Sequence, residues 1–164
     1  MLEAIRSRRS IRQFTDQPVS EGEIESLLSA AMAAPSANAR YPWEFVVVRD
    51  PELRRQLAGV HQFSGMCAQA PVVFVPCGDE SRSDYWIEDC SAATENLLLQ
   101  ARALGLGGVW VGIRPRPERE RKVKEILSIP DPLRVLCLVP VGHPAEERPP
   151  HGGFDRDKVH WDRY

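Results

Sequence analysis

DCSAATENLLLQARALGLGGVWVG, which spans Asp89 to Gly112, is the stretch that decides the fold. Its apolar side chains recur at helical spacing and predict a long amphipathic helix from about Trp86 to Leu104. Gly105 and Gly107 end that helix, and Val109 to Ile113 follows as a strand. A dinucleotide-binding glycine turn follows a strand and opens a helix, so the order found here argues against that kind of site.

The regions on both sides of this stretch alternate between helix and strand. Ser20 and Glu23 form a capping box at the start of a second helix, which Pro35 ends. The remaining expected elements are helices at Met1–Arg9, from Asp50 onward and at Pro117–Leu127, and strands at Glu44–Arg49, Pro71–Cys77 and Val135–Val141. This alternation predicts an α+β or α/β sandwich with helices covering a sheet.

Length and composition favour one globular domain over residues 1–164, because 43% of the residues are apolar and 27% are charged. The net charge of -2 gives no reason to expect nucleic acid or a membrane as a partner. No apolar run is long enough to span a membrane and the first residues lack a signal-peptide core, so we expect a cytoplasmic protein. The four cysteines form no CxxC pair and have no histidine at zinc spacing, so we expect reduced core thiols and no metal site.

Arginine is concentrated near the N-terminus, in the segment RRSIRQF at Arg8–Phe14. Guanidinium groups bind phosphate oxygens bidentately, and the hydroxyl of Ser10 adds a further donor. The segment therefore suits an anion site, although arginines near a terminus are also common on a plain solvated surface.

A second candidate segment is APSANARYPWEFVVV at Ala34–Val48. On its own it reads as a proline-bounded turn that leads into a strand, with Trp43 in the core.

RRSIRQF, PSANARYPW and SAATENLLLQARALGLGGVW occur in an order and at a spacing that resemble the nitroreductase family over nearly the whole chain. The resemblance implies an α+β fold, namely a three-layer sandwich whose central, mostly antiparallel sheet is flanked by helices. It also implies an intertwined homodimer with FMN bound at the subunit interface.

By this resemblance, Arg8 and Ser10 would contact the phosphate and ribityl chain of FMN, and Arg9 would assist at the phosphate end. Arg12 would lie near the N1 and O2 edge of the flavin ring, where a fixed cation stabilises the negative charge of the reduced ring.

The other implied contacts come from the loop and from the glycine turn. Pro35, Ser36, Ala37 and Asn38 would lie along the flavin edge, Tyr41 would line the substrate side, and the backbone of Leu106, Gly107 and Gly108 would face N5 and O4. The chain departs from the family pattern here, because Ala39 stands where an asparagine is usual and Tyr41 where a glutamine is usual.

The tail from Val141 to Tyr164 resembles the end of short family members, but His151, Gly152 and Gly153 stand where a second phosphate-binding basic pair is usual. Arg148, His151 or the N-terminal arginines alone are the alternatives for that role.

The resemblance implies ping-pong chemistry, in which hydride passes from NADH or NADPH through FMN to a nitroaromatic, a quinone or a similar small acceptor. No catalytic side chain is assigned, because the cofactor carries the chemistry. Flavin reduction, dehalogenation and azoline oxidation are other activities of such a fold, and Gln62–Gln69 are candidates for shaping the acceptor pocket. Two other classes stay open: an FMN-binding protein with a regulatory or storage role and little turnover, and a structural domain whose basic N-terminus binds a protein.

Overall fold

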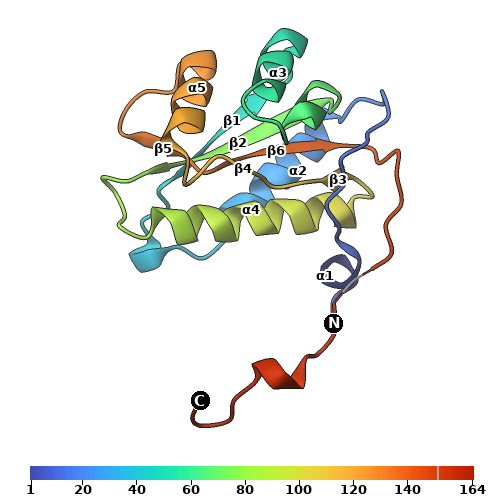
Figure 1. Cartoon of the computed structure of the whole chain (residues 1–164), viewed down its shortest axis with the longest axis vertical. Helices are drawn as coiled ribbons and strands as arrows, with labels where there is room; N and C mark the ends of the chain where they lie inside the picture. The colour runs from blue at the N-terminus through green and yellow to red at the C-terminus, as the bar shows by residue number, and fades with distance from the viewer. Residues whose placement is uncertain (151) are drawn as a thin grey trace.

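The computed structural model describes residues 1–150 and 152–164, and in it a six-stranded sheet lies between two layers of helices (Figure 1). The α-helices are α1 (Glu3–Ser7), α2 (Glu21–Met32), α3 (Pro51–Ala58), α4 (Trp86–Ala103) and α5 (Pro117–Leu127). The strands are β1 (Trp43–Val48), β2 (Val72–Asp79), β3 (Gly107–Gly108), β4 (Val111–Gly112), β5 (Leu133–Val135) and β6 (Cys137–Gly142). Three short 3-10 helices complete the set: η1 (Ala37–Ala39), η2 (Gly65–Ala68) and η3 (Arg156–Lys158).

The sheet follows the order β1-β2-β6-β3, with β4 also paired to β6 and β5 to β2, and every one of these pairings is antiparallel. The two central strands, β2 and β6, are buried almost along their whole length. The predicted α+β sandwich with a mostly antiparallel sheet is therefore confirmed.

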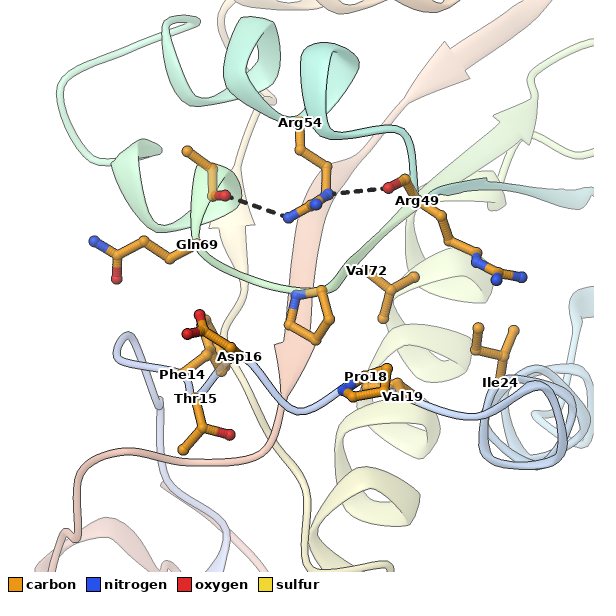
Figure 2. A pocket seen from close by; sticks show the side chains of 12 residues that line it. Phe14, Thr15, Asp16, Pro18, Val19, Ile24, Arg49, Arg54, Gln69 and Val72 are labelled. Atoms are coloured by element: carbon orange, nitrogen blue, oxygen red, sulfur yellow. Dashed lines mark hydrogen bonds between the residues drawn. The ribbon is translucent and has the colours of Figure 1, made fainter.

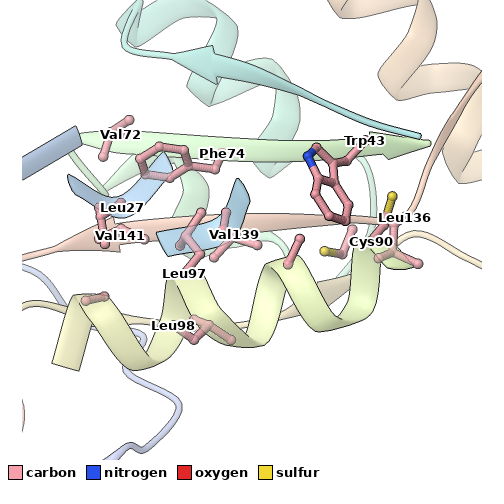
Figure 3. Packing of buried hydrophobic residues seen from close by; sticks show 14 of the residues in the cluster. Leu27, Trp43, Val72, Phe74, Cys90, Leu97, Leu98, Leu136, Val139 and Val141 are labelled. Carbon is pink, nitrogen blue, oxygen red and sulfur yellow. The ribbon is translucent and has the colours of Figure 1, made fainter. Parts of the chain in front are cut away.

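Each face of the sheet has its own core. Val72 and Phe74 of β2 point toward α2 and α4, and Val73 and Val75 point toward α3 and α5, as the alternation of side chains along a strand requires. Figure 3 shows the first core, in which Phe74 and Leu97 lie between the sheet and α4. Trp43 belongs to this core and is 8% exposed, as predicted.

Two expected strands are interrupted. The strand expected at Val109–Ile113 is wrong in its extent, because β3 and β4 are separate two-residue strands on either side of a gap. Their common register against β6 places the gap opposite Pro140, which has no N–H to donate to the ladder.

The strand expected at Val135–Val141 is split into β5 and β6 at Leu136. Along β2, two residues separate the partners of Val135 and Val139, whereas three residues separate Val135 and Val139 themselves. One extra residue on one strand is a β-bulge, and the N–H of Leu136 donates to the carbonyl of Pro76 at 3.1 Å.

The end of α4 directs the chain toward the candidate site. Gly105 has a φ of +77°, which glycine adopts without steric cost. The N–H of Leu106 then donates to the carbonyl of Ala101 at 2.8 Å, which closes the helix in the manner of a Schellman motif. The chain reverses there and enters β3 at the edge of the sheet.

The C-terminal segment leaves the body of the molecule after β6 and ends well away from it (Figure 1). Its large apolar side chains are exposed to solvent: Phe154 is 72% exposed and Trp161 is 82% exposed. Among the described residues, no helix combines the length and the apolar character needed to cross a membrane.

Candidate functional site

The N-terminal arginine segment lies directly against the glycine turn. Ser10 forms a parallel bridge with Gly108, and the N–H of Ile11 donates to the carbonyl of Gly108 at 3.0 Å. A Cβ at Gly107 would lie 2.8 Å from the Cβ of Ile11, which is closer than real side chains come. The glycine at that position therefore lets the arginine segment pack on β3.

A cavity of about 320 Å³ opens beside this contact. Four arginines line it, Arg8, Arg9, Arg102 and Arg148, and the turn Leu106–Gly108 forms part of its wall. We call this cavity the arginine pocket. Carboxylates of Glu146 and Glu147 also line it, at the side formed by the tail.

Two of the arginines are held by neighbours in α1 and α4. Arg8 Nε lies 3.1 Å from Glu95 Oε1, on the face of α4 that meets the N-terminal segment. Arg102 Nε donates to the hydroxyl of Ser7 at 2.8 Å. Glu95 and Arg102 are seven residues apart, which places them on one face of the helix.

The other two arginines are held by the tail. Arg9 donates to the backbone carbonyl of Pro149, and Arg148 Nη2 lies 2.7 Å from Glu146 Oε2. The other oxygen of Glu146 accepts the backbone N–H of Arg12 at 2.6 Å. This N–H bond, together with Arg148, lowers the pKa of Glu146 below its ordinary value. The side chain of Arg12 itself is exposed.

The second predicted segment is anchored by a buried carboxylate, that of Asp89 in the first turn of α4. One oxygen of Asp89 accepts the N–H of Ala37 at 2.8 Å, and the other accepts the hydroxyls of Ser36 and Ser83, each at 3.1 Å. Ser36 Oγ in turn accepts the N–H of Tyr41 at 2.9 Å. The loop is thereby fixed at both ends.

Three residues of this loop have left-handed backbone conformations that side chains seldom adopt: Asn38 at φ 53°, Ala39 at φ 52° and Tyr41 at φ 45°. Such conformations persist where surrounding contacts hold them, and they are concentrated at functional sites. The ring of Tyr41 is half exposed and lies 5.5 Å from that of Trp43, centroid to centroid.

The loop and the arginine pocket lie at opposite ends of α4. Asp89 anchors the loop and Arg102 lines the pocket. Arg102 lies 13 positions after Asp89, which corresponds to roughly 20 Å along a helix. A single chain therefore brings Arg8 and Arg9 together with Leu106–Gly108, but it does not bring Pro35–Asn38 to the same place.

A larger cavity of about 600 Å³ lies on the other side of the N-terminal segment, beside Phe14 (Figure 2). Gln69 lines it, and Gln69 belongs to the segment considered for the acceptor pocket. Figure 2 shows Arg54 directed toward the carbonyl of Arg49. Arg54 donates to this carbonyl at 3.2 Å and to that of Ala68 at 3.3 Å. Arg54 thus ties η2 to α3, and none of the residues predicted to hold FMN lines this cavity.

The cysteines are buried free thiols, as expected from their scatter along the chain. Burial raises the pKa of Cys67, Cys77 and Cys90 to about 12, and that of Cys137 well above its ordinary value. Thiols in this state are poor nucleophiles at neutral pH.

Comparison with known proteins shows which family the chain belongs to. The sequence profile described as Nitroreductase family matches residues 5–62 and 63–143. The chain belongs to the nitroreductase family. A protein of Archaeoglobus fulgidus, provisionally named an NADH dehydrogenase/NAD(P)H nitroreductase, is 42% identical over 170 residues, which cover 99% of this chain and 98% of that protein.

Solved nitroreductase-family structures share the fold. An FMN-dependent nitroreductase from Clostridium difficile R20291 is 32% identical, with a TM-score of 0.94 and full coverage of both chains. A provisionally named nitroreductase from Desulfovibrio desulfuricans, solved in complex with FMN, is 29% identical, with a TM-score of 0.83, and the match covers 99% of this chain and 96% of that one.

Within this nitroreductase-family chain, sequence reasoning missed Ser7, Asp89 and Arg102. Asp89 and Arg102 lie inside the helix that the sequence located well, but their partners are distant in the chain and no local pattern marks them. His151, one alternative for the second phosphate contact, lies outside the described residues, and Arg148 does line the arginine pocket.

Proposed function

We propose that this protein is an FMN-dependent oxidoreductase that uses NADH or NADPH to reduce a nitroaromatic, a quinone or a similar small acceptor. The observation that carries the proposal is the arginine pocket, where the residues expected at the phosphate end of FMN meet the glycine turn expected at its ring. The names of the related proteins point to the same chemistry.

The donor set of the pocket suits the phosphate of FMN. Guanidinium groups match phosphate oxygens in charge and in bidentate geometry, and four arginines line a cavity of about 320 Å³. Arg8, Arg9 and Ser10 would hold the phosphate and the ribityl chain, and Leu106–Gly108 would offer backbone groups to the ring.

When bound, FMN would supply the redox chemistry, namely hydride transfer from a nicotinamide nucleotide to the acceptor. The chain contributes binding, orientation and charge. Arg12 would place a cation near the N1 and O2 edge of the ring, where negative charge develops on reduction. The side chain of Arg12 is exposed, and its backbone N–H donates to Glu146 at 2.6 Å.

We further propose a homodimer in which the loop Pro35–Asn38 of one chain completes the arginine pocket of the other. The roughly 20 Å along α4 that separates the two parts within one chain supports this arrangement. The exposed Phe154 and Trp161 of the tail support it as well, because large apolar side chains on an extended segment need a partner surface. A cytoplasmic location stays a prediction.

Steady-state oxidation of NADH and NADPH by the FMN-loaded protein, with and without a nitroaromatic or a quinone, tests the proposed activity. We expect turnover that depends on the acceptor, and the faster nucleotide is the preferred reductant. Tight FMN binding with no turnover of either nucleotide would instead favour the alternative of a flavin-binding protein with a regulatory or storage role.

A further inference from the structure

Arg102 is a cation of the arginine pocket to which nothing in the sequence motifs gives a role. We propose that Arg102 supplies a second phosphate contact for FMN in this chain, in place of the basic pair that the tail lacks. The proposal rests on the proposed function and names a further residue that recognises the phosphate end of the cofactor.

The position of Arg102 follows from the way α4 ends. Arg102 lies in the last turn of the helix, just before Gly105 reverses the chain toward β3. It lines the same cavity as Arg8 and Arg9, but it approaches from α4 rather than from the N-terminal segment. An anion in the pocket would therefore meet guanidinium groups from two different elements.

The side chain of Arg102 is oriented before any ligand binds. Ser7 is buried, donates its hydroxyl to the carbonyl of Glu3 at 2.8 Å and accepts Arg102 Nε at 2.8 Å. This contact uses one of the five N–H donors of a guanidinium and leaves the two Nη groups for a ligand. Less conformational freedom is then lost when a phosphate binds.

The charges in the pocket separate its arginines into two pairs. Arg8 and Arg148 each have a carboxylate partner, Glu95 and Glu146 respectively. Arg9 and Arg102 have neutral partners, a carbonyl and a hydroxyl, and form no ion pair within residues 1–150 and 152–164.

Glu3, in the same helix as Ser7, forms its ion pair with Arg6 at 2.8 Å, and the more distant charge of Arg102 contributes to lowering the pKa of Glu3. Two cations without a carboxylate partner, Arg9 and Arg102, match the charge of a phosphate dianion.

Arg148 is the weaker candidate for the same role. Its Nε and Nη2 both contact Glu146 Oε2, at 2.9 and 2.7 Å, and the other oxygen of Glu146 holds the backbone of Arg12. Binding a phosphate would require Arg148 to leave a carboxylate that also anchors the N-terminal segment. Arg102 would lose at most its hydrogen bond to the hydroxyl of Ser7, and it would lose no bond if its Nη groups bind the phosphate.

The test compares FMN with riboflavin, which has the same ring and ribityl chain but no phosphate. Dissociation constants for both flavins are measured by fluorescence quenching on the full-length apoprotein of the wild type and of Arg102→Gln, Arg148→Gln and Arg121→Gln. Arg121 is a matched control, because its side chain is 71% exposed on α5 and far from the pocket. Thermal unfolding of each apoprotein monitors the fold, and Arg102→Lys, which keeps the charge, is measured beside Arg102→Gln.

We expect Arg102→Gln to weaken FMN binding about 10- to 100-fold, the usual cost of losing a hydrogen bond to a charged group. Its riboflavin affinity should not change, and Arg102→Lys should recover part of the loss. Arg148→Gln should weaken FMN binding less than Arg102→Gln does, and Arg121→Gln should bind FMN like the wild type.

The proposal is overturned if Arg102→Gln binds FMN normally, or if it loses both flavins equally, because the role would then be structural. A loss of FMN binding in Arg148→Gln alone would assign the contact to the tail. A wild type that binds neither flavin would contradict the proposed function as well, and this outcome is distinct from the other two.

Discussion

Asp89 connects residues of the candidate site that lie far apart in sequence. Its buried carboxylate accepts hydrogen bonds from Ser36, Ala37 and Ser83, and it holds the loop whose backbone is left-handed at Asn38 and Tyr41. The loop motif itself was visible in the sequence, but its anchor was not, because Asp89 lies 52 positions after Ala37. Contacts of this kind depend on how the helices pack and leave no local periodicity.

Replacing Asp89 with Asn should therefore destabilise the protein. The amide keeps the shape but has one oxygen acceptor in place of two, so the N–H of Ala37 or the two hydroxyls lose their partner. We expect the free energy of unfolding to fall by about 1–3 kcal/mol in denaturant titrations. Asp84→Asn, at an exposed neighbouring position, serves as the control. Equal stability of Asp89→Asn and the wild type would contradict the anchoring role.

Gly107 offers a second test at the residue scale. Gly107→Ala would place a methyl group 2.8 Å from the Cβ of Ile11, so the N-terminal segment would have to move. Overpacking of this kind costs about 1–3 kcal/mol of stability, and we expect weaker FMN binding as well because Ser10 follows the same backbone. Gly22→Ala is the control, because a Cβ there meets nothing within 4 Å. If both variants unfold at the same temperature, the close packing is not needed.

At the scale of elements, helices were easier to predict than strands. The capping box of Ser20 and Glu23 and the proline after Asp50 mark the starts of α2 and α3, and both caps form as predicted. The strands at β3–β4 and β5–β6 were expected to be continuous. They are divided by Pro140 and by a bulge at Leu136, whose effects depend on which strand lies opposite and so cannot be derived from one segment alone.

The contact between α5 and the segment after α3 predicts a pH dependence of stability. Burial, and then the charge of Arg119, lowers the pKa of His61 below its ordinary value, and its Nε2 is buried with no partner among the described residues. Below a pH of about 6.5, His61 is protonated in the unfolded chain, whereas its lowered pKa disfavours protonation in the folded chain. The stability linked to His61 is therefore present above that pH and is lost as the pH falls below it.

Urea titrations between pH 8 and pH 5 measure this effect. The wild type should lose stability on acidification more steeply than His61→Gln, whereas His160→Gln, at an exposed position, should follow the wild type. Parallel curves for His61→Gln and the wild type would contradict a His61 that resists protonation in the folded chain.

At the scale of the whole molecule, the proposed shared site makes a prediction about mixed dimers. Arg8→Glu combined with Arg9→Glu should abolish the arginine pocket, and Ala37→Phe should block the loop, so each variant should be inactive alone. In a mixed dimer, one site combines the intact pocket of one chain with the intact loop of the other. Random mixing makes half of the dimers mixed, and each has one working site of two, which gives about a quarter of the wild-type activity.

The mixture is measured after the two variants, carrying different affinity tags, are unfolded and refolded together. Recovery of activity in the doubly tagged fraction is the expected result. A doubly tagged fraction without activity would indicate that one chain supplies both parts of its own site. That result would contradict the proposal that the distance along α4 keeps the two parts of one chain apart.

The central claim, that this chain binds FMN and reduces it with a nicotinamide nucleotide, is tested most directly by an anaerobic absorbance spectrum. The FMN-loaded protein is recorded before and after addition of NADH or NADPH, and again after a nitroaromatic or a quinone. We predict that at least one nucleotide bleaches the long-wavelength flavin band and that the acceptor restores it. A flavin band that neither nucleotide changes, or a protein that takes up no flavin, would contradict the account.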